Sequence, residues 1–149
     1  MSSKVYQAPV TVGHIAEKDL LTCDADTPLL SAAKLMKQRK TSSILIQKDE
    51  DIVGIWTEAD CTKIDFTQST FYQQPIRKYM SSPIQSVDSK LPLVELSSQF
   101  QHKGVRHLLV KDHEKLIGLV SQSDAIHHQG AEHYLQLRTV KSSFNANIP

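Results

Sequence analysis

An internal repeat is the feature that most constrains how this chain folds. A shift of 64 residues lays the sequence on itself without a gap, so that Gly54 falls on Gly118 and Asp60 falls on Asp124. The apolar classes of the intervening residues agree as well. Agreement at a fixed period indicates that one supersecondary unit occurs twice.

Each repeat has the pattern strand, helix, strand, strand, helix. In the first repeat, apolar residues at helical spacing follow Thr27 and Pro28, which suit an N-cap and a first helical position. Short continuous apolar runs at residues 43–47 and 107–111 are typical of buried strands. Each run leads through a polar turn to a further strand. The pattern predicts an α+β fold.

The repeat also sets the expected domain boundaries. We place the first repeat at residues 10–73, the second at 74–130, and a C-terminal helix and tail at 131–149. A chain of 149 residues can bury about 68–70% of its unfolded surface. It therefore needs no metal or disulfide to fold.

Composition and charge exclude several classes of function. A formal net charge of +1 gives no general attraction to nucleic acid or to an acidic membrane. The N-terminus lacks the apolar core of a signal peptide, and no apolar run approaches the length of a membrane span. Two cysteines do not make a disulfide framework. We expect a cytoplasmic protein without nucleic-acid or membrane partners.

Both repeats end in a strand that runs into a helix start. Thr57 stands three positions before Asp60, and Ser121 stands three positions before Asp124. This spacing is that of a capping box. A helix start presents unpaired N–H groups and the positive end of the helix dipole, so it is a natural anion site. The two pairs either only cap their helices or also hold a ligand.

These features together resemble a tandem pair of CBS domains (cystathionine-β-synthase-type repeats), an arrangement called a Bateman module. The resemblance rests on the doubled β-α-β-β-α repeat and on the glycine–apolar–apolar–Ser/Thr–x–x–Asp signature at Gly54–Asp60 and Gly118–Asp124. The run Gly104–Val110 strengthens it, and Lys78–Pro83 resembles the usual lead-in to such a repeat. It covers roughly residues 10–130.

The resemblance implies a regulatory module rather than an enzyme. Two repeats pack sheet against sheet about a pseudo-twofold axis. Clefts between them bind an adenosine-containing ligand, such as AMP, ADP, ATP or S-adenosylmethionine. The adenine nucleotide is a regulatory ligand, and no cofactor is required. Such modules usually form homodimers and control a fused or separate partner.

The resemblance also implies roles for individual residues. Asp60 and Asp124 match the ribose-binding position, where one carboxylate can accept hydrogen bonds from two neighbouring hydroxyls. Thr57 and Ser121 match the position that faces the phosphate. The positions that contact base or sugar are Thr22, Ser42, Ser43, Ser86 and Val105.

The two half-sites are unequal in charge. Arg106 and His107 match a basic pair near the phosphate, whereas the corresponding residues of the first repeat are serines. Arg106 is either a phosphate ligand, forking onto two oxygens, or a surface residue. His107 could make the contact depend on pH. We expect the better nucleotide site at Arg106, Ser121 and Asp124.

The first repeat departs from the family pattern at two positions. Ala59 stands where the family commonly has a basic residue. Trp56 replaces the usual aliphatic residue, and it either blocks the first cleft, stacks on a base or packs at an interface, of which we favour the last.

Two hypotheses remain for the whole chain. One is a sensor of adenine nucleotides; the alternative is a structural dimerisation module with degenerate, empty clefts. No catalytic or metal site is expected, because the histidines near residue 130 have no cysteine or acidic cluster to complete a ligand set. The C-terminal helix either leads towards an output signalling domain, such as a diguanylate cyclase, or packs back on the module.

Overall fold

The computed structural model describes residues 10–129 of the chain. These residues form two compact units. We call residues 19–85 the first unit, and residues 10–18 together with 86–129 the second unit. The helix and tail predicted at 131–149 lie outside the described residues. The helices found in residues 10–129 all lack the length and hydrophobicity of a membrane span.

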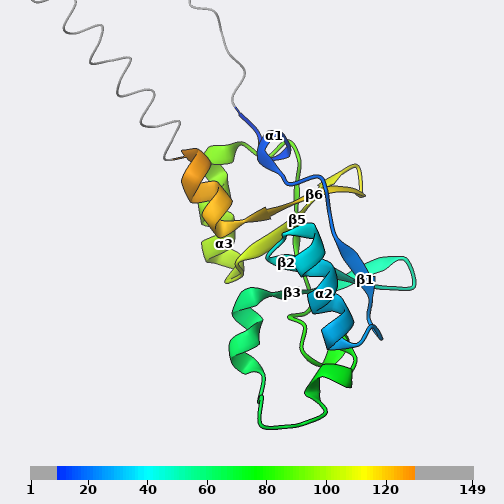
Figure 1. Cartoon of the computed structure of the whole chain (residues 1–149). Helices are drawn as coiled ribbons and strands as arrows, with labels where there is room; N and C mark the ends of the chain where they lie inside the picture. Colours follow the sequence, from blue (N-terminus) through cyan, green and yellow to red (C-terminus); the bar gives the residue numbers. More distant parts are fainter. Residues whose placement is uncertain (1–9, 130–149) are drawn as a thin grey trace, which may run out of the picture. The chain divides into compact units, whose positions relative to one another are not determined.

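The first unit is a three-stranded sheet with a helix packed on one face (Figure 1). Its elements are β1 (Thr22–Asp24), α2 (Leu29–Arg39), β2 (Ser43–Lys48), β3 (Asp51–Thr57) and the 3₁₀ helices η1 (Glu58–Lys63), η2 (Phe71–Gln73) and η3 (Ile76–Lys78). Strand β2 lies between β1, which is parallel to it, and β3, which is antiparallel. Ile44 and Trp56 are register partners in β2 and β3, and they share a core with Leu29 and Met36 of α2.

The second unit repeats this arrangement. Its elements are α1 (Val12–Ile15), β4 (Ser86–Asp88), the 3₁₀ helix η4 (Leu93–Glu95), α3 (Leu96–Lys103), β5 (His107–Asp112) and β6 (Lys115–Ser121), after which residues 122–129 are helical. The strand order is β4–β5–β6. Leu108 and Val120 pair across β5 and β6 and share a core with Leu96 and Phe100 of α3. The predicted α+β class is confirmed.

The lead-in segments are exchanged between the repeats. Ser81 precedes the second sheet in sequence, yet it pairs with Ile55 of the first, with N···O distances of 2.8 and 3.0 Å. Glu17 precedes the first sheet and pairs with Leu119 of the second, at 2.8 and 2.9 Å. A Cβ placed at Gly54 would lie 2.8 Å from the carbonyl oxygen of Ser81, so this close approach requires glycine. The compact units therefore differ from the sequence repeats by their lead-ins.

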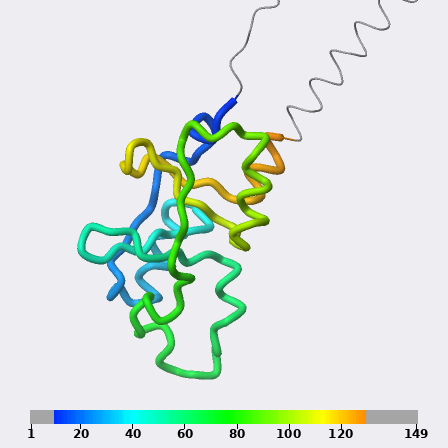
Figure 2. Tube along the Cα trace, turned by 180° about the vertical axis from the view of Figure 1, so that it is seen from behind, coloured from blue at the N-terminus to red at the C-terminus, as the bar shows by residue number. Residues whose placement is uncertain are grey.

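Both hairpin turns have a left-handed backbone at residues other than glycine. The φ angle is 50° at Asp49 and 71° at Glu50, and it is 48° at His113 and 66° at Glu114. Positive φ at both central residues characterises the type I′ turn, whose twist matches the flanking strands. Figure 2 shows the two turns in teal and yellow, each at the tip of its hairpin. Residues with a Cβ pay a steric cost in this conformation.

The start of α2 differs from the sequence prediction. We expected Thr27 as the N-cap, and this is wrong by one residue, because Pro28 holds that position. The backbone N–H of Leu29 donates to the carbonyl of Gln74 at 2.9 Å, and the N–H of Ile76 donates to the carbonyl of Thr27 at 2.8 Å. A carbonyl from the connection 64–75 thus satisfies the first helical amide in place of a capping side chain.

The predicted final helix of the first repeat is a 3₁₀ helix of six residues, η1. It ends at Lys63, and the C-cap residue Ile64 has extended φ and ψ angles of −88° and 128°. The β-branched residues Thr62 and Ile64 favour helix less than unbranched residues do. Asp65 then starts a local turn, in which its Oδ1 accepts a hydrogen bond from the N–H of Thr67 at 3.0 Å.

Candidate functional site

The carboxylate of Asp60 is fully occupied by groups of the first unit. Its Oδ2 accepts hydrogen bonds from the backbone N–H of Thr57 at 2.8 Å and from the Thr57 hydroxyl at 3.3 Å. Its Oδ1 accepts from the ammonium of Lys63 at 3.0 Å and from the hydroxyl of Ser81 at 3.2 Å. Asp60 is 6% exposed. Both oxygens are therefore used to hold η1 and the exchanged lead-in.

The carboxylate of Asp124 accepts fewer hydrogen bonds than that of Asp60. Its Oδ2 accepts from the N–H of Ser121 at 3.1 Å, and its own N–H donates to the Ser121 hydroxyl at 3.1 Å. This is the reciprocal capping box that the spacing predicts. The hydroxyls of Ser121 and Ser123 are 3.1 Å apart. Asp124 is a half-buried residue, and its Oδ1 accepts no hydrogen bond from residues 10–129.

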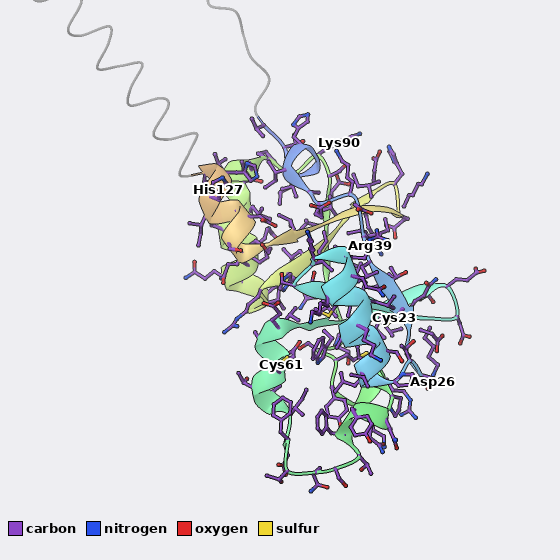
Figure 3. The ribbon with its side chains drawn as sticks, in the orientation of Figure 1. Cys23, Asp26, Arg39, Cys61, Lys90 and His127 are labelled. Carbon is purple, nitrogen blue, oxygen red and sulfur yellow. The ribbon has the colours of Figure 1, made fainter. Side chains whose placement is uncertain are left out.

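The repeat explains this difference between the two carboxylates. Glu17 occupies the position that matches Ser81, and His127 occupies the position that matches Lys63. An ionised carboxylate cannot donate a hydrogen bond, so Glu17 cannot replace the Ser81 hydroxyl. Figure 3 places His127 in the helix that follows β6.

Four of the predicted residues meet at one end of the second sheet. His107 opens β5 and is the register partner of Ser121, which closes β6. The N–H of Gln122 donates to the carbonyl of Arg106 at 2.9 Å, which brings Arg106 beside the helix start that carries Asp124. The Arg106 side chain is exposed and forms no ion pair within the described part of the chain. A cation, a helix start and a carboxylate oxygen are thus grouped in one unit.

The remaining predicted residues of the second unit lie nearby. Ser86 begins β4 and is the register partner of Leu109 on the parallel strand β5, so it lies at the same end of the sheet. Val105 is half-buried and packs against the core of the unit.

The first unit has the same layout without the free cation. Ser43 is the register partner of Thr57, and the carbonyl of Ser42 accepts from the N–H of Glu58 at 3.1 Å. Thr22 is exposed on β1 and pairs with Leu45. The nearest basic residue along η1, Lys63, is already bonded to the buried aspartate.

Ala59 and Trp56, the two residues at which the first repeat departs from the family pattern, lie in different environments. Ala59 is exposed on η1. Trp56 is 4% exposed and lies in the core on the side of the sheet covered by α2. We expected Trp56 at an interface, but the side chain packs in the interior of the first unit, which was not among the three alternatives.

Comparison with known protein families matches two segments, residues 12–66 and 76–130, to the CBS domain. Together these segments make up more than half of the chain. The chain belongs to the CBS-domain family. The resemblance inferred from the doubled signature is confirmed.

Curated relatives of this CBS-domain chain include proteins from an archaeon and a bacterium. An uncharacterized protein of Methanopyrus kandleri is 32% identical over 121 residues, which cover 78% of this chain and 61% of that protein. The CBS domain-containing protein YhcV of Bacillus subtilis is 26% identical over 112 residues, covering 72% of this chain and 80% of YhcV. The match therefore spans less than two thirds of the Methanopyrus protein.

Solved structures of CBS-domain proteins share the fold. A protein with CBS domains from Burkholderia ambifaria matches with a TM-score of 0.71 at 26% identity, over 81% of this chain and 94% of that one. The CBS domain pair of protein MJ0100, solved with 5′-methylthioadenosine and S-adenosyl-L-methionine, matches with 0.69 at 19%, over 84% and 99%. CBSX2, solved with AMP, matches with 0.64 at 21%, over 86% and 98%.

Sequence reasoning missed two residues that matter to the first CBS domain. Lys63 lies one helical turn beyond Asp60, and this i, i+3 spacing could have indicated the ion pair. Ser81 lies 21 residues away from Asp60 in sequence, and no local pattern signals their contact.

Cysteine and metal chemistry are not apparent in the part of the chain that the structure describes. Cys23 and Cys61 are free thiols, separated in Figure 3 on β1 and η1. Burial raises the pKa of each thiol. His127 and His128 stack edge to face, with ring centroids 5.4 Å apart. Within residues 10–129, no group of three His, Cys, Asp or Glu side chains could hold a metal ion.

Proposed function

We propose that the second CBS domain binds an adenosine-containing nucleotide and that the chain is a regulatory sensor of that ligand. The observation that carries this proposal is the Asp124 carboxylate, whose Oδ1 receives no hydrogen bond from the described residues. A ribose presents two neighbouring hydroxyls that can donate to such an oxygen. The Asp124 position is the one that the family resemblance assigns to ribose.

The surroundings of Asp124 suit the rest of a nucleotide. The helix start at Ser121 offers N–H groups and a positive dipole end to a phosphate. The exposed guanidinium of Arg106 can fork onto phosphate oxygens, and His107 lies opposite Ser121 in the sheet. Ser86 and Val105 remain the proposed contacts to base or sugar.

Ligands found in related proteins support the same class of molecule. Protein MJ0100 was solved with 5′-methylthioadenosine and S-adenosyl-L-methionine, and CBSX2 was solved with AMP. At 19% and 21% identity these proteins share the fold with this chain. Their ligands are the reason to test AMP, ADP, ATP and S-adenosylmethionine first.

We propose that the first CBS domain is the weaker half-site. Asp60 would have to give up its bonds to Lys63 and Ser81 before it could accept from a ribose. That exchange costs hydrogen bonds to a charged group. Thr22, Ser42, Ser43 and Thr57 stay candidate contacts to base, sugar or phosphate in this half-site.

Regulation would follow from differential binding. A nucleotide that binds one conformation of the module better than another shifts the population toward that conformation. A fused or separate partner, such as an output signalling domain after residue 130, would read this shift. We propose this role for a cytoplasmic protein that needs no cofactor and performs no catalysis itself.

A thermal-shift titration with AMP, ADP, ATP and S-adenosylmethionine tests the proposal. At a concentration of one hundred times the dissociation constant, the bound nucleotide should stabilise the chain by about 2.7 kcal/mol. A saturable rise in Tm with at least one of the four is the expected result. The same Tm with all four would overturn the sensor function.

Dimerisation is the second candidate function, and exposed apolar side chains favour it. Val94 on η4 is 74% exposed, and Ile126 is 67% exposed. The Gln129 amide donates to the carbonyl of Leu93 at 2.7 Å and its oxygen accepts from Ser97 at 2.7 Å, which ties the two helical segments together. We propose that a second copy of this chain covers Val94 and Ile126.

A further inference from the structure

We propose that His127 closes the second half-site when it is protonated, so that nucleotide binding weakens as the pH falls. In the closed state, the imidazolium of His127 lies on Oδ1 of Asp124 and withdraws that oxygen from the ribose. This regulation rests on the proposed nucleotide site at Asp124. The first CBS domain already has the closed arrangement, because the ammonium of Lys63 occupies Oδ1 of Asp60.

The repeat places His127 at the position of Lys63. The two residues are one repeat period of 64 apart, and each follows its aspartate by three positions. In the first domain this spacing brings the Lys63 ammonium within 3.0 Å of the carboxylate oxygen of Asp60. Residues three apart are also neighbours on the surface of an α-helix, the form of residues 122–129. His127 can therefore reach Asp124 as Lys63 reaches Asp60.

Both partners of the proposed pair are available. Oδ1 of Asp124 accepts no hydrogen bond from the described residues. His127 is exposed on the helix that follows β6 (Figure 3), and it forms no ion pair within residues 10–129. Its ring packs edge to face on that of His128, with centroids 5.4 Å apart. This arrangement corresponds to the open half-site.

The charge of the imidazole decides between the stacked and the paired position. Histidine gains its charge as the pH falls from 8 to 5. A neutral ring is not attracted to the Asp124 carboxylate by charge, whereas an imidazolium is. Two charged rings in contact also repel each other, so acidification weakens the stack of His127 on His128. The half-site is therefore open at pH 8 and closes as the pH falls.

The segments hydrogen-bonded to this helix or to the strand before it carry further titratable and charged groups. They come from the lead-in, from η4 and α3, and from the start of β5, and they are Glu17, Glu95, His102, Lys103, Arg106 and His107. Protonation of His107 would attract a phosphate and strengthen binding, which is the opposite direction. The sign of the pH dependence therefore separates His127 from His107.

Calorimetric titration at pH 8 and at pH 5.5 tests the proposal. The probe is whichever of AMP, ADP, ATP and S-adenosylmethionine gives the largest thermal shift at pH 8. Acidification should weaken binding to the wild-type chain about threefold more than binding to His127→Gln, because a closed fraction of about two thirds lowers the apparent affinity threefold. The comparison of the two chains cancels the titration of the probe and of His107. His128→Gln should retain the wild-type pH dependence.

His127→Lys makes the closure permanent, because it gives the second domain the Lys–Asp pair of the first. At pH 8 it should weaken binding roughly three- to tenfold. It should also raise the Tm of the nucleotide-free chain by about 1–2 °C. Gln101→Lys adds the same charge at an exposed position of α3 and should leave the affinity unchanged. General attraction by an added charge would instead strengthen the binding of an anionic nucleotide.

A His127→Lys chain that binds as tightly as the wild type at pH 8 would overturn the closure. So would the same pH dependence in the wild type and in His127→Gln. Either result would leave the nucleotide site in place. The absence of a thermal shift with all four probes at pH 8 would overturn the proposed site itself, and its regulation by His127 with it.

Discussion

At the scale of single residues, one signature produces two different carboxylates. The Thr/Ser–x–x–Asp spacing predicted a helix cap at both Asp60 and Asp124, and each carboxylate bonds the backbone N–H at its cap position. Only Asp60 gains Lys63 and Ser81 as further partners. The sequence could indicate the caps because they are local. It could not indicate the Ser81 contact, which depends on how the chain returns to the sheet.

We predict that Asp60→Ala costs more stability than Asp124→Ala in the absence of nucleotide. Removing the Asp60 carboxylate leaves the partly buried N–H of Thr57 unpaired and frees Lys63 and Ser81, for a loss of about 2–3 kcal/mol. Asp124→Ala removes one cap, for about 1 kcal/mol. Urea unfolding followed by circular dichroism measures both losses. Equal losses in the two variants would contradict the stabilising role assigned to the hydrogen bonds of Asp60 with Lys63 and Ser81.

At the scale of elements, periodicity predicted the sheets and helices well, because apolar runs and helical spacing are local signals. The exchanged lead-ins escaped prediction. Ser81 pairs with Ile55, and Glu17 pairs with Leu119, through backbone groups that leave no pattern in the side chains. The start of α2 was mispredicted for the same reason, because the N–H of Leu29 donates to a backbone carbonyl, that of Gln74.

The hairpin turns yield a prediction in the stabilising direction. Glu50→Gly and Glu114→Gly should each raise the free energy of unfolding by roughly 0.5–1 kcal/mol, because glycine adopts positive φ without the steric cost of a Cβ. Lys115→Gly, at the adjacent extended residue of β6, is the control and should destabilise. Denaturant midpoints of the three variants provide the measurement. A loss of stability in both turn variants would contradict the strain assigned to these turns.

At the scale of the whole molecule, the doubled repeat was enough to predict the family, and the family match at 12–66 and 76–130 confirms it. The choice between the two half-sites needed the structure. Arg106 corresponds to Ser42, so a difference in charge between the half-sites is visible in the sequence. The hydrogen bonds that occupy the oxygens of Asp60 are visible only in the structure, which places Lys63 and Ser81 beside it.

The proposed homodimer is tested by changing its apolar contact. Val94→Asp combined with Ile126→Asp should convert the dimer to a monomer at micromolar concentration, because each buried apolar contact becomes a buried charge. Gln101→Glu adds a negative charge at an exposed position of α3 and should leave the dimer intact. Light scattering coupled to size exclusion reports the mass of each. A doubly substituted chain that still runs as a dimer would contradict this interface.

Calorimetric titration of the nucleotide that gives the largest thermal shift shows which of the two CBS domains holds the ligand. We expect Asp124→Ala to weaken binding by about tenfold or more, because hydrogen bonds to a charged group are lost. A folded Asp60→Ala variant should change the affinity by less than about threefold. Binding that is lost in Asp60→Ala and retained in Asp124→Ala would contradict a nucleotide site in the second CBS domain.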